Sequence, residues 1–461
     1  MQPVVTPDQM REIDAAAPVS VDVLIERAGR AVAASARRIL GGTYGRKVVV
    51  LAGPGNNGAD GLVAARVLGG WGVQVRIVRV DRDHPPPVEL HAADLVIDAA
   101  YGTGFHGEFI APDCGSIPVL AVDIPSGLDG LSGLSGASSR PFVCVHTCTF
   151  AALKPGLLFG DGPAHAGTVE VADIGLAAAS SVQLLDRETV RDRLPDRNHS
   201  SHKWTAGVLV IGGSTGMTGA PSLAARAAMR AGSGMVRLVI PGDPHPTAGP
   251  FGAEVVGVPV PEYGWEDAVA AAAGKCRALV VGPGIGREPR TLASVSALIA
   301  RCAEMPVVVD ADGLYALRGK RIDDRRADAG VVLTPHDGEY RALTGQPVGE
   351  DRIEAARALA RAVNAVVLLK GPTTIVADVG GRVELVANGD SRLATAGSGD
   401  VLSGIIGALM AQGLTAFEAA STGAFAHAGA SLLGERVGFV AGDIISLLPT
   451  WFTRQGTRSN Q

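Results

Sequence analysis

The sequence predicts two successive α/β domains, of which the first is a doubly wound parallel sheet, and three observations support this prediction. The chain has 461 residues, more than a single hydrophobic core usually organises. Short β-branched runs alternate with helical segments along its length. Many of these runs end at glycine or aspartate, which is typical of parallel sheets that bind ligands beyond the carboxyl ends of their strands.

The first domain is expected to begin with helices and to continue as a Rossmann-like alternation. Thr6 and Gln9 have the spacing of a capping box at the start of a helix, and a second helical run continues through Leu24–Leu40. The expected strands are 47–52, 73–80, 94–98 and 119–123, and 61–68 is an expected helix between the first two strands.

The sequence becomes small and polar at Ala177–Ser181, and the charged segment Asp186–Arg197 follows. We therefore expect two domains, residues 1–180 and 181–461. The tail from Thr453 onward is expected to be frayed. The second domain should again be α/β, with strands at 208–211, 236–240, 278–281, 306–310, 330–334 and 366–370.

Composition and charge exclude several classes of function. The net charge of −5 gives no basic surface for nucleic acid, and Met1–Asp14 lacks the basic start and apolar core of a secretion signal. The apolar stretch Val401–Leu414 is too short to span a bilayer and should be a buried helix. Five cysteines without CxxC spacing indicate reduced thiols. We expect a cytoplasmic enzyme without a nucleic-acid or membrane partner.

A glycine-rich segment, residues 51–61, joins the first expected strand to a helix. Backbone N–H groups at such a helix start can hold phosphate, although the glycines alone are equally explained by a tight turn. Turn sterics explain Asn56, Asn57 and Asp60 less well, because their side-chain oxygens suit a hard cation or a sugar.

Two further strand ends in the first domain carry polar residues. Asp98 precedes the loop Gly102–Glu108, and Asp123 is followed by Ser126. Each aspartate could individually be a helix cap or turn former. Because the ends of parallel strands converge, the three segments together favour a nucleotide pocket.

The second domain contains the most informative stretch, residues 388–404, which runs directly into the apolar helix. Consecutive N–H groups at that helix start can stabilise a phosphoryl group in flight. Asp400 lies beside them and could deprotonate a hydroxyl nucleophile. The competing interpretation is that Asp400 only complements the helix dipole.

Other strand ends support the functional interpretation of Asp400. Lys370–Thr374 closes a strand and could hold the phosphates of a second nucleotide. Residues 282–286, 310–312 and 334–339 close further strands. His336 on its own would more often be a loop histidine than a ligand, but its place in the last of these segments favours a role in binding.

The motifs of the first half resemble the N-terminal domain of the NAD(P)H-hydrate repair family. They are GPGNNGADG, DAAYGTGFHG, DIPSGLDG and TFAALKPGL, and the resemblance covers nearly all of residues 1–180. It implies an epimerase that interconverts the R and S hydrates, with Asp123 as general acid/base. It also implies a potassium site at Asn57, Asp98 and Ser126. The residues implied in hydrate binding are Asn56, Asn57, Gly58, Ala59, Asp60, Gly102, Thr103, Gly104, Phe105, His106, Gly107, Glu108 and Asp123.

The second half, residues 198–445, resembles the ribokinase-like superfamily and, more narrowly, the ADP-dependent dehydratase of the same repair family. The matching motifs are SHK, LVIGGS, VGPGIG, DADGL, TPHDGE, KGPTT and LATAGSGD. Departures from the family pattern occur at Trp204–Ala206, Asp337 and Ala396, and in the first half at Ala59. The resemblance implies hydrate contacts by Ala220, Gly284, His336 and Asp400, and ADP binding by Lys370, Gly371, Pro372, Thr373, Thr374 and Gly399.

The resemblance implies metabolite repair of hydrated NADH and NADPH. Phosphoryl transfer from ADP, with Mg²⁺ offsetting charge, would turn the hydroxyl into a phosphate leaving group and release AMP and phosphate. The family commonly self-associates, so a homo-oligomer is expected. One alternative is a kinase of a small alcohol such as a vitamin precursor, with a nucleotide-binding module in front. In another, the first domain is a noncatalytic regulatory module.

Overall fold

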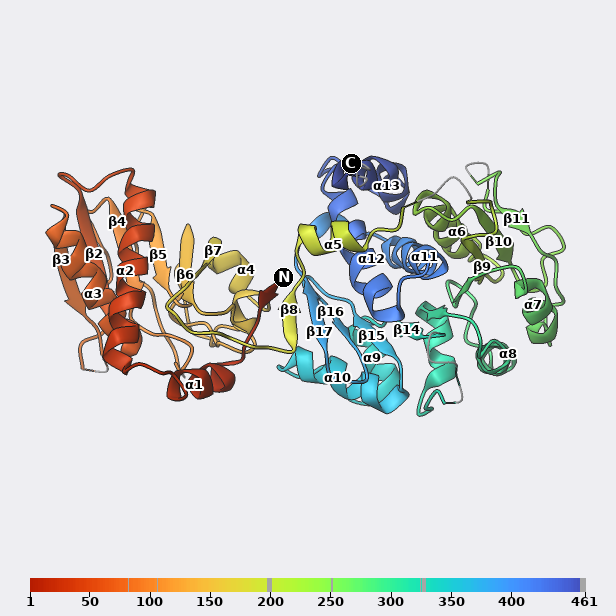
Figure 1. Ribbon diagram of the computed structural model, residues 1–461, viewed down its shortest axis with the longest axis horizontal. Coiled ribbons are helices and arrows are strands. Elements are labelled where there is room, and N and C mark those ends of the chain that lie inside the picture. The colour runs from red at the N-terminus through yellow and green to blue at the C-terminus, as the bar shows by residue number, and fades with distance from the viewer. Residues whose placement is uncertain are drawn as a thin grey trace. The chain divides into compact units, whose positions relative to one another are not determined.

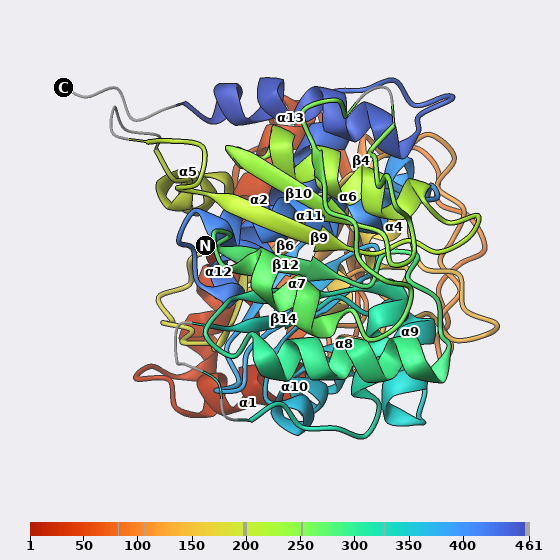
Figure 2. The same cartoon turned by 90° about the vertical axis from the view of Figure 1, so that its right-hand side faces the viewer.

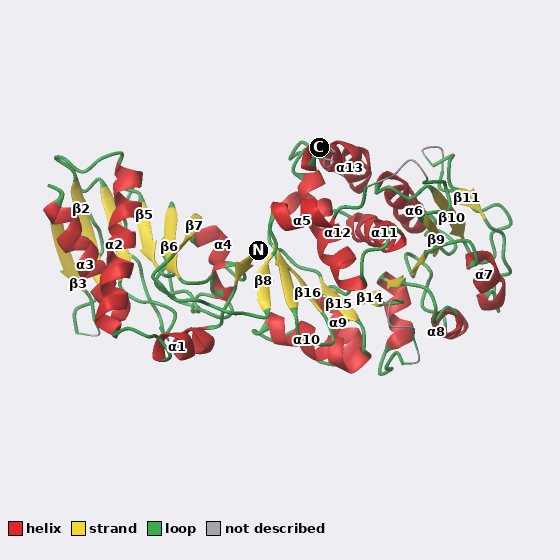
Figure 3. Cartoon of the chain, in the orientation of Figure 1, coloured by secondary structure: helices red, strands yellow, loops and turns green. Residues whose placement is uncertain are grey.

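The computed structural model describes residues 1–81, 83–105, 107–196, 201–249, 252–323, 325 and 329–456. By its internal contacts the chain divides into two compact units (Figure 1). The first is Gln2–Val182, and the second is Gln183–Gln461 together with Met1. Both are α/β structures in which helices and strands alternate (Figure 3).

The first unit is built on a parallel sheet with the strand order β3-β2-β4-β5-β6-β7. The order reverses beside β2, so the chain winds outward in both directions from this strand, as the doubly wound prediction requires. The elements are β1 (Gln2–Pro3), α1 (Pro7–Ala15), α2 (Val21–Leu40), β2 (Lys47–Ala52), α3 (Asn56–Gly70), β3 (Gln74–Arg79), β4 (Leu95–Ala99), β5 (Val119–Val122), β6 (His146–Phe150), α4 (Gly162–His165) and β7 (Thr168–Ala172).

The two faces of this sheet are covered differently. Val48 and Val50 of β2 pack with apolar residues of α2 and α3, whereas Val49 packs with Phe109 and Phe142 from loop segments. Successive side chains of a strand point to opposite faces, so both sets are buried. One face is therefore covered by helices and the other largely by loops, which leaves room for a cavity beside the strand ends.

The sequence predicted the start of the first helix correctly, but it predicted the start of the third helix several residues too far along the chain. Thr6 forms the expected capping box with Gln9. Helix α3 begins at Asn56, whereas we expected the helix from residue 61, because Gly58 and Gly61 weaken the helical pattern. Strands β6 and β7 were not expected, since the threonines and histidine of His146–Phe150 interrupt an apolar run even though the strand is largely buried.

The second unit contains a larger sheet with the order β8-β17-β16-β15-β14-β13-β12-β9-β10-β11. Its central strands are parallel, and β15, β16 and β17 pair antiparallel. The strands are β8 (Val182–Leu184), β9 (Gly207–Ile211), β10 (Met235–Val239), β11 (Val256–Gly257), β12 (Ala278–Val281), β13 (Val307–Val309), β14 (Val331–Leu333), β15 (Val366–Leu369), β16 (Thr374–Ala377) and β17 (Val383–Val386).

Helices cover both faces of this sheet (Figures 1 and 2). The face that carries α6, α11, α12 and α13 encloses the main core, and α8 and α10 lie on the opposite face. The helices are α5 (Arg187–Arg193), α6 (Gly219–Arg230), α7 (Glu266–Ala273), α8 (Pro289–Arg301), α9 (Asp337–Thr344), α10 (Arg352–Val363), α11 (Ser398–Ala411), α12 (Ala416–Ser431) and α13 (Ala441–Gln455).

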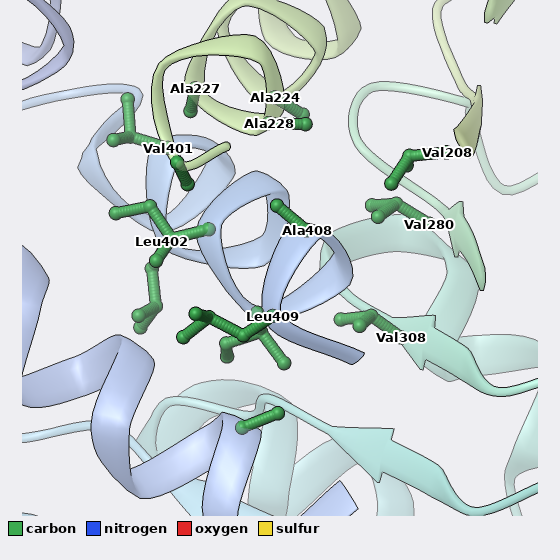
Figure 4. Packing of buried hydrophobic residues seen from close by; sticks show 14 of the residues in the cluster. Val208, Ala224, Ala227, Ala228, Val280, Val308, Val401, Leu402, Ala408 and Leu409 are labelled. Atoms are coloured by element: carbon green, nitrogen blue, oxygen red, sulfur yellow. The ribbon is translucent and has the colours of Figure 1, made fainter. Parts of the chain in front are cut away.

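Helix α11 is the central helix of this core (Figure 4). Every residue of Val401–Ala411 is buried, which confirms the buried helix expected from the sequence. In the part of the chain that the structure describes, no helix is long and apolar enough to cross a membrane. The expected frayed tail was wrong for its first residues, because α13 continues to Gln455 and buries Trp451; residues 457–461 lie outside the described residues.

The packing of α11 on α6 depends on Gly404. A β-carbon built on Gly404 would lie 2.1 Å from the Ala224 carbonyl oxygen, so a side chain there would force the two helices apart. We expect Gly404→Ala to lower the free energy of unfolding by about 1–3 kcal/mol, measured by urea denaturation. Gly442→Ala is the matched control, because a β-carbon on this helical glycine meets no atom within 4 Å. Equal stability of both variants would contradict the packing argument.

Candidate functional site

The first unit contains an open cavity of about 1970 Å³ at the carboxyl ends of its strands. The cavity is lined by three segments that the sequence singled out, which follow β2, β4 and β5. The expected site residues that line it are Asn56, Asn57, Asp60, Gly102, Thr103, Gly104, Phe105, Gly107, Glu108 and Asp123. Gly58 and Ala59 are not among the described lining residues, and His106 lies outside the described residues.

The glycines of the β2–α3 turn are required by close backbone approach. A β-carbon on Gly53 would lie 1.7 Å from the Ala100 carbonyl oxygen, and one on Gly58 would lie 1.9 Å from the Gly53 carbonyl oxygen. Side chains at these positions would push the turn away from the segment after β4. The glycines thus bring Asn57 and the loop that begins at Gly102 together, as the packing of these two residues shows.

Asp123 is held at the end of β5 by a buried lysine. Its φ of 67° is left-handed, a conformation that aspartate tolerates better than most residues. Lys154 Nζ lies 2.6 Å from Asp123 Oδ1, and the lysine side chain is only 1% exposed. The ammonium also donates to Thr149 Oγ1 and to the Phe150 carbonyl, each at 2.9 Å. This network fixes the orientation of the Asp123 carboxylate toward the cavity.

Sequence reasoning assigned no role to Lys154. The sequence does indicate that this lysine is buried, because it follows the apolar residues Phe150–Leu153 within TFAALKPGL. A lysine is rarely fully buried unless it is paired. What the sequence does not show is the partner, since Asp123 is more than thirty residues away along the chain.

Asp60 projects from the first turns of α3 into the same cavity. It is 7% exposed. Burial raises the pKa of Asp60 to about 8, with further contributions from the negative charges of Asp123 and Asp14, and Lys154 opposes the rise. Asp60 is therefore a neutral carboxylic acid at pH 7.

Asp98 and Ser126 form a second polar group behind the cavity wall. Asp98 is fully buried and accepts hydrogen bonds from the Ser126 amide at 2.8 Å and the Ser126 hydroxyl at 2.6 Å. Burial raises its pKa to about 6, and no cation is among the groups that shift it. Asn57 Nδ2 is buried without a hydrogen-bond partner among the described residues.

The second unit places Asp400 in the first turn of α11. Gly397 precedes it with a left-handed φ of 87°, and a β-carbon on Gly397 would lie 3.9 Å from Asp400 Oδ2. The carboxylate therefore turns back toward the glycine-rich segment instead of away from it. Burial raises the pKa of Asp400 to about 7, aided by Asp310 and Glu339 and opposed by Lys370.

Lys370 is the cation of this second group. Its Nζ lies 3.1 Å from Asp310 Oδ1 and 3.4 Å from Glu339 Oε2. Burial disfavours its charge, but the two carboxylates outweigh that effect and the pKa of Lys370 is raised. A β-carbon on Gly399 would lie 3.4 Å from the same Nζ. The ends of β13 and β15 and the start of α11 thus meet around one ammonium.

The remaining expected residues of the second unit lie in packing contacts, in a helix cap and in the segment after β15. Ala220 lies beside Gly284, 3.2 Å from where a β-carbon on that glycine would stand. His336 is the N-cap of α9, and its Nδ1 accepts from the amides of Gly338 and Glu339. The capping role accounts for a histidine at this position, and more than half of its side chain remains exposed. Gly371, Pro372 and Thr373 lie in the connection from β15 to β16, and Thr374 is the first residue of β16.

His427 of α12 was not expected from the sequence. It is 6% exposed, and its Nε2 has no hydrogen-bond partner among the described residues. Burial lowers its pKa to about 4, although the backbone of Ser398 favours the charged form. The histidine is therefore neutral beside the start of α11, a position that only the packing of two distant helices reveals.

These features define the class of the protein. Each unit is an α/β domain whose strand ends carry a glycine-dependent turn, a lysine paired with an aspartate and a carboxyl group with raised pKa, an arrangement that is typical of enzymes acting on nucleotides.

Comparisons with known proteins identify the family. A family model described as NAD(P)H-hydrate dehydratase matches residues 208–443, and one described as YjeF-related protein N-terminus matches residues 21–88 and 79–156. A bifunctional NAD(P)H-hydrate repair enzyme from Moorella thermoacetica is 36% identical, covering 93% of this chain and 91% of its own. A relative of the same description from Mycobacterium tuberculosis is 40% identical, with 83% and 82% covered.

A solved structure supports the same identification. The ADP/ATP-dependent NAD(P)H-hydrate dehydratase of Bacillus subtilis, co-crystallised with ATP and Mg²⁺, is 30% identical with a TM-score of 0.54. It covers 60% of this chain and is itself covered completely. The chain belongs to the bifunctional NAD(P)H-hydrate repair enzyme family.

The raised pKa of Asp60 makes stability depend on pH. Between pH about 4 and about 8 the folded protein keeps a proton on Asp60 that the unfolded chain has lost, so stability falls as pH rises through this window, by up to about 1.4 kcal/mol per pH unit. Asp60→Asn removes this dependence. We expect calorimetry to show a higher unfolding temperature for the variant at pH 8 and no difference near pH 4. A variant less stable than the wild type at pH 8 would contradict the burial argument.

Proposed function

We propose that this chain repairs hydrated reduced nicotinamide nucleotides in two steps. Residues 1–180 interconvert the R and S hydrates of NADH and NADPH, and residues 181–461 dehydrate the S hydrate with ADP as phosphoryl donor. The names of the relatives in both halves support this proposal. The observation that carries it is the Asp400 carboxylate, which faces the glycine-rich start of α11 beside Lys370.

The dehydratase step follows from that geometry. Hydroxide is a poor leaving group, so direct loss of water is slow near neutral pH. Asp400 accepts the proton of the substrate hydroxyl as its oxygen attacks the terminal phosphorus of ADP. The N–H groups at the start of α11 stabilise the phosphoryl group in transfer, and Lys370, which adjoins Gly399, holds the nucleotide phosphates.

Elimination completes the reaction. The C–O bond breaks, phosphate departs with the electron pair, and loss of the neighbouring ring proton restores the reduced nicotinamide; AMP and phosphate are released. Mg²⁺ bound to the phosphates would neutralise charge during transfer. Such an ion fits this site, because Asp310, Asp312 and Glu339 add negative charge around Asp400, which Lys370 offsets only in part.

The epimerase half is proposed to hold potassium at Asn57, Asp98 and Ser126. The residues fit a cation, because the buried carboxylate of Asp98 has no cationic partner among the groups that affect its pKa, and the Ser126 hydroxyl, 2.6 Å from Asp98 Oδ1, offers a second oxygen. Bound potassium would balance the Asp98 charge and rigidify the wall of the cavity.

A small-alcohol kinase is the alternative that shares the Asp400 chemistry. Both reactions transfer a phosphoryl group to a hydroxyl, so they differ in the product: a kinase releases a phosphorylated alcohol, whereas the repair enzyme releases reduced nicotinamide nucleotide and free phosphate. The family membership of the chain favours repair over this alternative. Incubation of mixed hydrate epimers with ADP and Mg²⁺, followed by reduced-nicotinamide absorbance, tests the proposal directly.

Asp400→Asn should abolish dehydration. The amide keeps the shape of the side chain but cannot accept the hydroxyl proton, so we expect kcat to fall by about 100-fold or more, measured by recovery of absorbance with ADP and pure S hydrate. In the wild type, kcat/KM should rise with pH through about 7, because Asp400 must be ionised to act as the base.

The control for Asp400 is a first-turn carboxylate outside the site. Glu354 occupies the first turn of α10, so Glu354→Gln alters the same kind of helix-terminal charge and should leave the dehydration rate unchanged. If both variants lose activity equally, or if Asp400→Asn keeps it, the role of Asp400 as base is wrong.

Potassium should stabilise the first unit selectively. We expect KCl to raise its unfolding temperature above that in choline chloride of equal ionic strength, because a ligand that binds the folded state stabilises it. Asp98→Asn should remove this difference, and Glu12→Gln, which removes an exposed carboxylate of α1, should preserve it. Calorimetry of the full chain measures both. Identical unfolding temperatures of the wild type in the two salts would contradict the potassium site.

A further inference from the structure

Four ionisable side chains from different segments line the cavity of the first unit. Asp14 comes from α1, Asp60 from α3, Asp123 from the end of β5 and Lys154 from the segment after β6. Three carboxyl groups therefore share one ammonium. The carboxyl group that contacts this ammonium is stabilised as the anion, and a carboxyl group without such a contact more readily keeps its proton.

Lys154 forms a direct ion pair with Asp123. The 2.6 Å contact joins Nζ to Oδ1, and Thr149 Oγ1 donates to the same carboxylate oxygen at 2.9 Å. With its other hydrogen bonds the lysine is fully occupied and buried. The charge of the Asp123 carboxylate is thus balanced, and this group suits the role of proton acceptor.

Asp60 has no such partner. Its carboxyl group makes no hydrogen bond or ion pair with the other residues that the structure describes, and it is buried at the cavity wall. A carboxyl group in this position is far less costly to bury as the neutral acid than as the anion, and the nearby charges of Asp123 and Asp14 act in the same direction. Asp123 is thus paired with an ammonium while Asp60 has no charged partner, so the two carboxyl groups of one pocket are suited to different proton-transfer roles.

We propose that Asp60 is the catalytic acid of the epimerase, which protonates the departing hydroxyl group of the hydrate, and that Asp123, held by Lys154, is the base. This proposal rests on the epimerase activity proposed above and assigns a proton-transfer role to a residue that was expected only to bind the substrate.

The proton balance of the reaction is complete. The C–O bond of the hydrate breaks, its electron pair stays with oxygen, and the Asp60 proton converts the leaving hydroxide to water. The ring nitrogen lone pair forms a double bond to the same carbon, giving an iminium cation. A water molecule then attacks the opposite face and gives a proton to Asp123. Transfer of that proton back to Asp60 through water restores both groups, and nothing is oxidised or reduced.

Asp60→Asn separates the acid from a merely buried polar group. The asparagine amide matches the neutral carboxyl group in shape and charge, so a structural role would survive the change. It cannot release a proton, so catalysis by Asp60 predicts that kcat for epimerisation falls by about 100-fold or more while KM changes by less than about threefold. The readout is conversion of pure R hydrate by the full chain in potassium buffer, resolved by chromatography.

The pH profile gives a second readout that a structural role would not move. The wild-type rate should fall above the Asp60 pKa of about 8, and the residual rate of Asp60→Asn should lack this alkaline limb. Asp14→Asn should move the alkaline limb to lower pH, because one nearby negative charge is lost. Asp22→Asn is the matched control, since Asp22 is an exposed aspartate at the start of α2 that is not among the cavity-lining residues. It should keep kcat within about threefold at pH 7 and leave the alkaline limb unchanged.

The outcomes separate this inference from the proposed function. If the wild type does not interconvert the hydrates, the epimerase activity itself is wrong and this role falls with it. If the wild type is active and Asp60→Asn keeps its rate and its alkaline limb, only the assignment of Asp60 is overturned. A loss of rate in Asp60→Asn together with an unchanged rate in Asp22→Asn supports the assignment.

Discussion

Both sites of this protein depend on the contact between a lysine ammonium and a buried or partly buried aspartate at the end of a parallel strand. In the first unit Lys154 pairs with Asp123, and in the second Lys370 pairs with Asp310. A buried charge is costly unless it is paired, so the pairing is what allows charged groups to lie at these strand ends. Asp400 lies near a lysine that is already paired with Asp310, and its pKa is raised to about 7.

The excess carboxyl group is the functional part of each arrangement. Asp60 and Asp400 both have a raised pKa because each lies near more negative than positive charge in a buried setting. The consequences differ with the reaction. A pKa near 8 keeps an acid protonated for donation, whereas a pKa near 7 lets a base accept a proton at neutral pH. In the roles proposed for Asp60 and Asp400, one physical principle serves proton donation in one half and proton acceptance in the other.

Close backbone approach is the second constraint. Gly53, Gly58 and Gly404 each leave no room for a β-carbon, so the cavity turn and the position of α11 require glycine for steric reasons. The sequence showed that glycines were abundant near strand ends, but a tight turn and a ligand site give the same pattern. Only the distances between segments far apart in the chain distinguish these two explanations.

The sequence by itself determined the α/β class, most of the parallel strands and the motifs that bring Asp123 and Asp400 to strand ends and helix starts. These follow from local patterns, because periodicity and turn residues act over a few positions. The early start of α3, the strands β6 and β7, the pairing of Lys154 and the burial of Asp60 were decided by the tertiary structure. Burial and charge balance depend on residues brought together from distant segments, and no local pattern records which groups will share one cation.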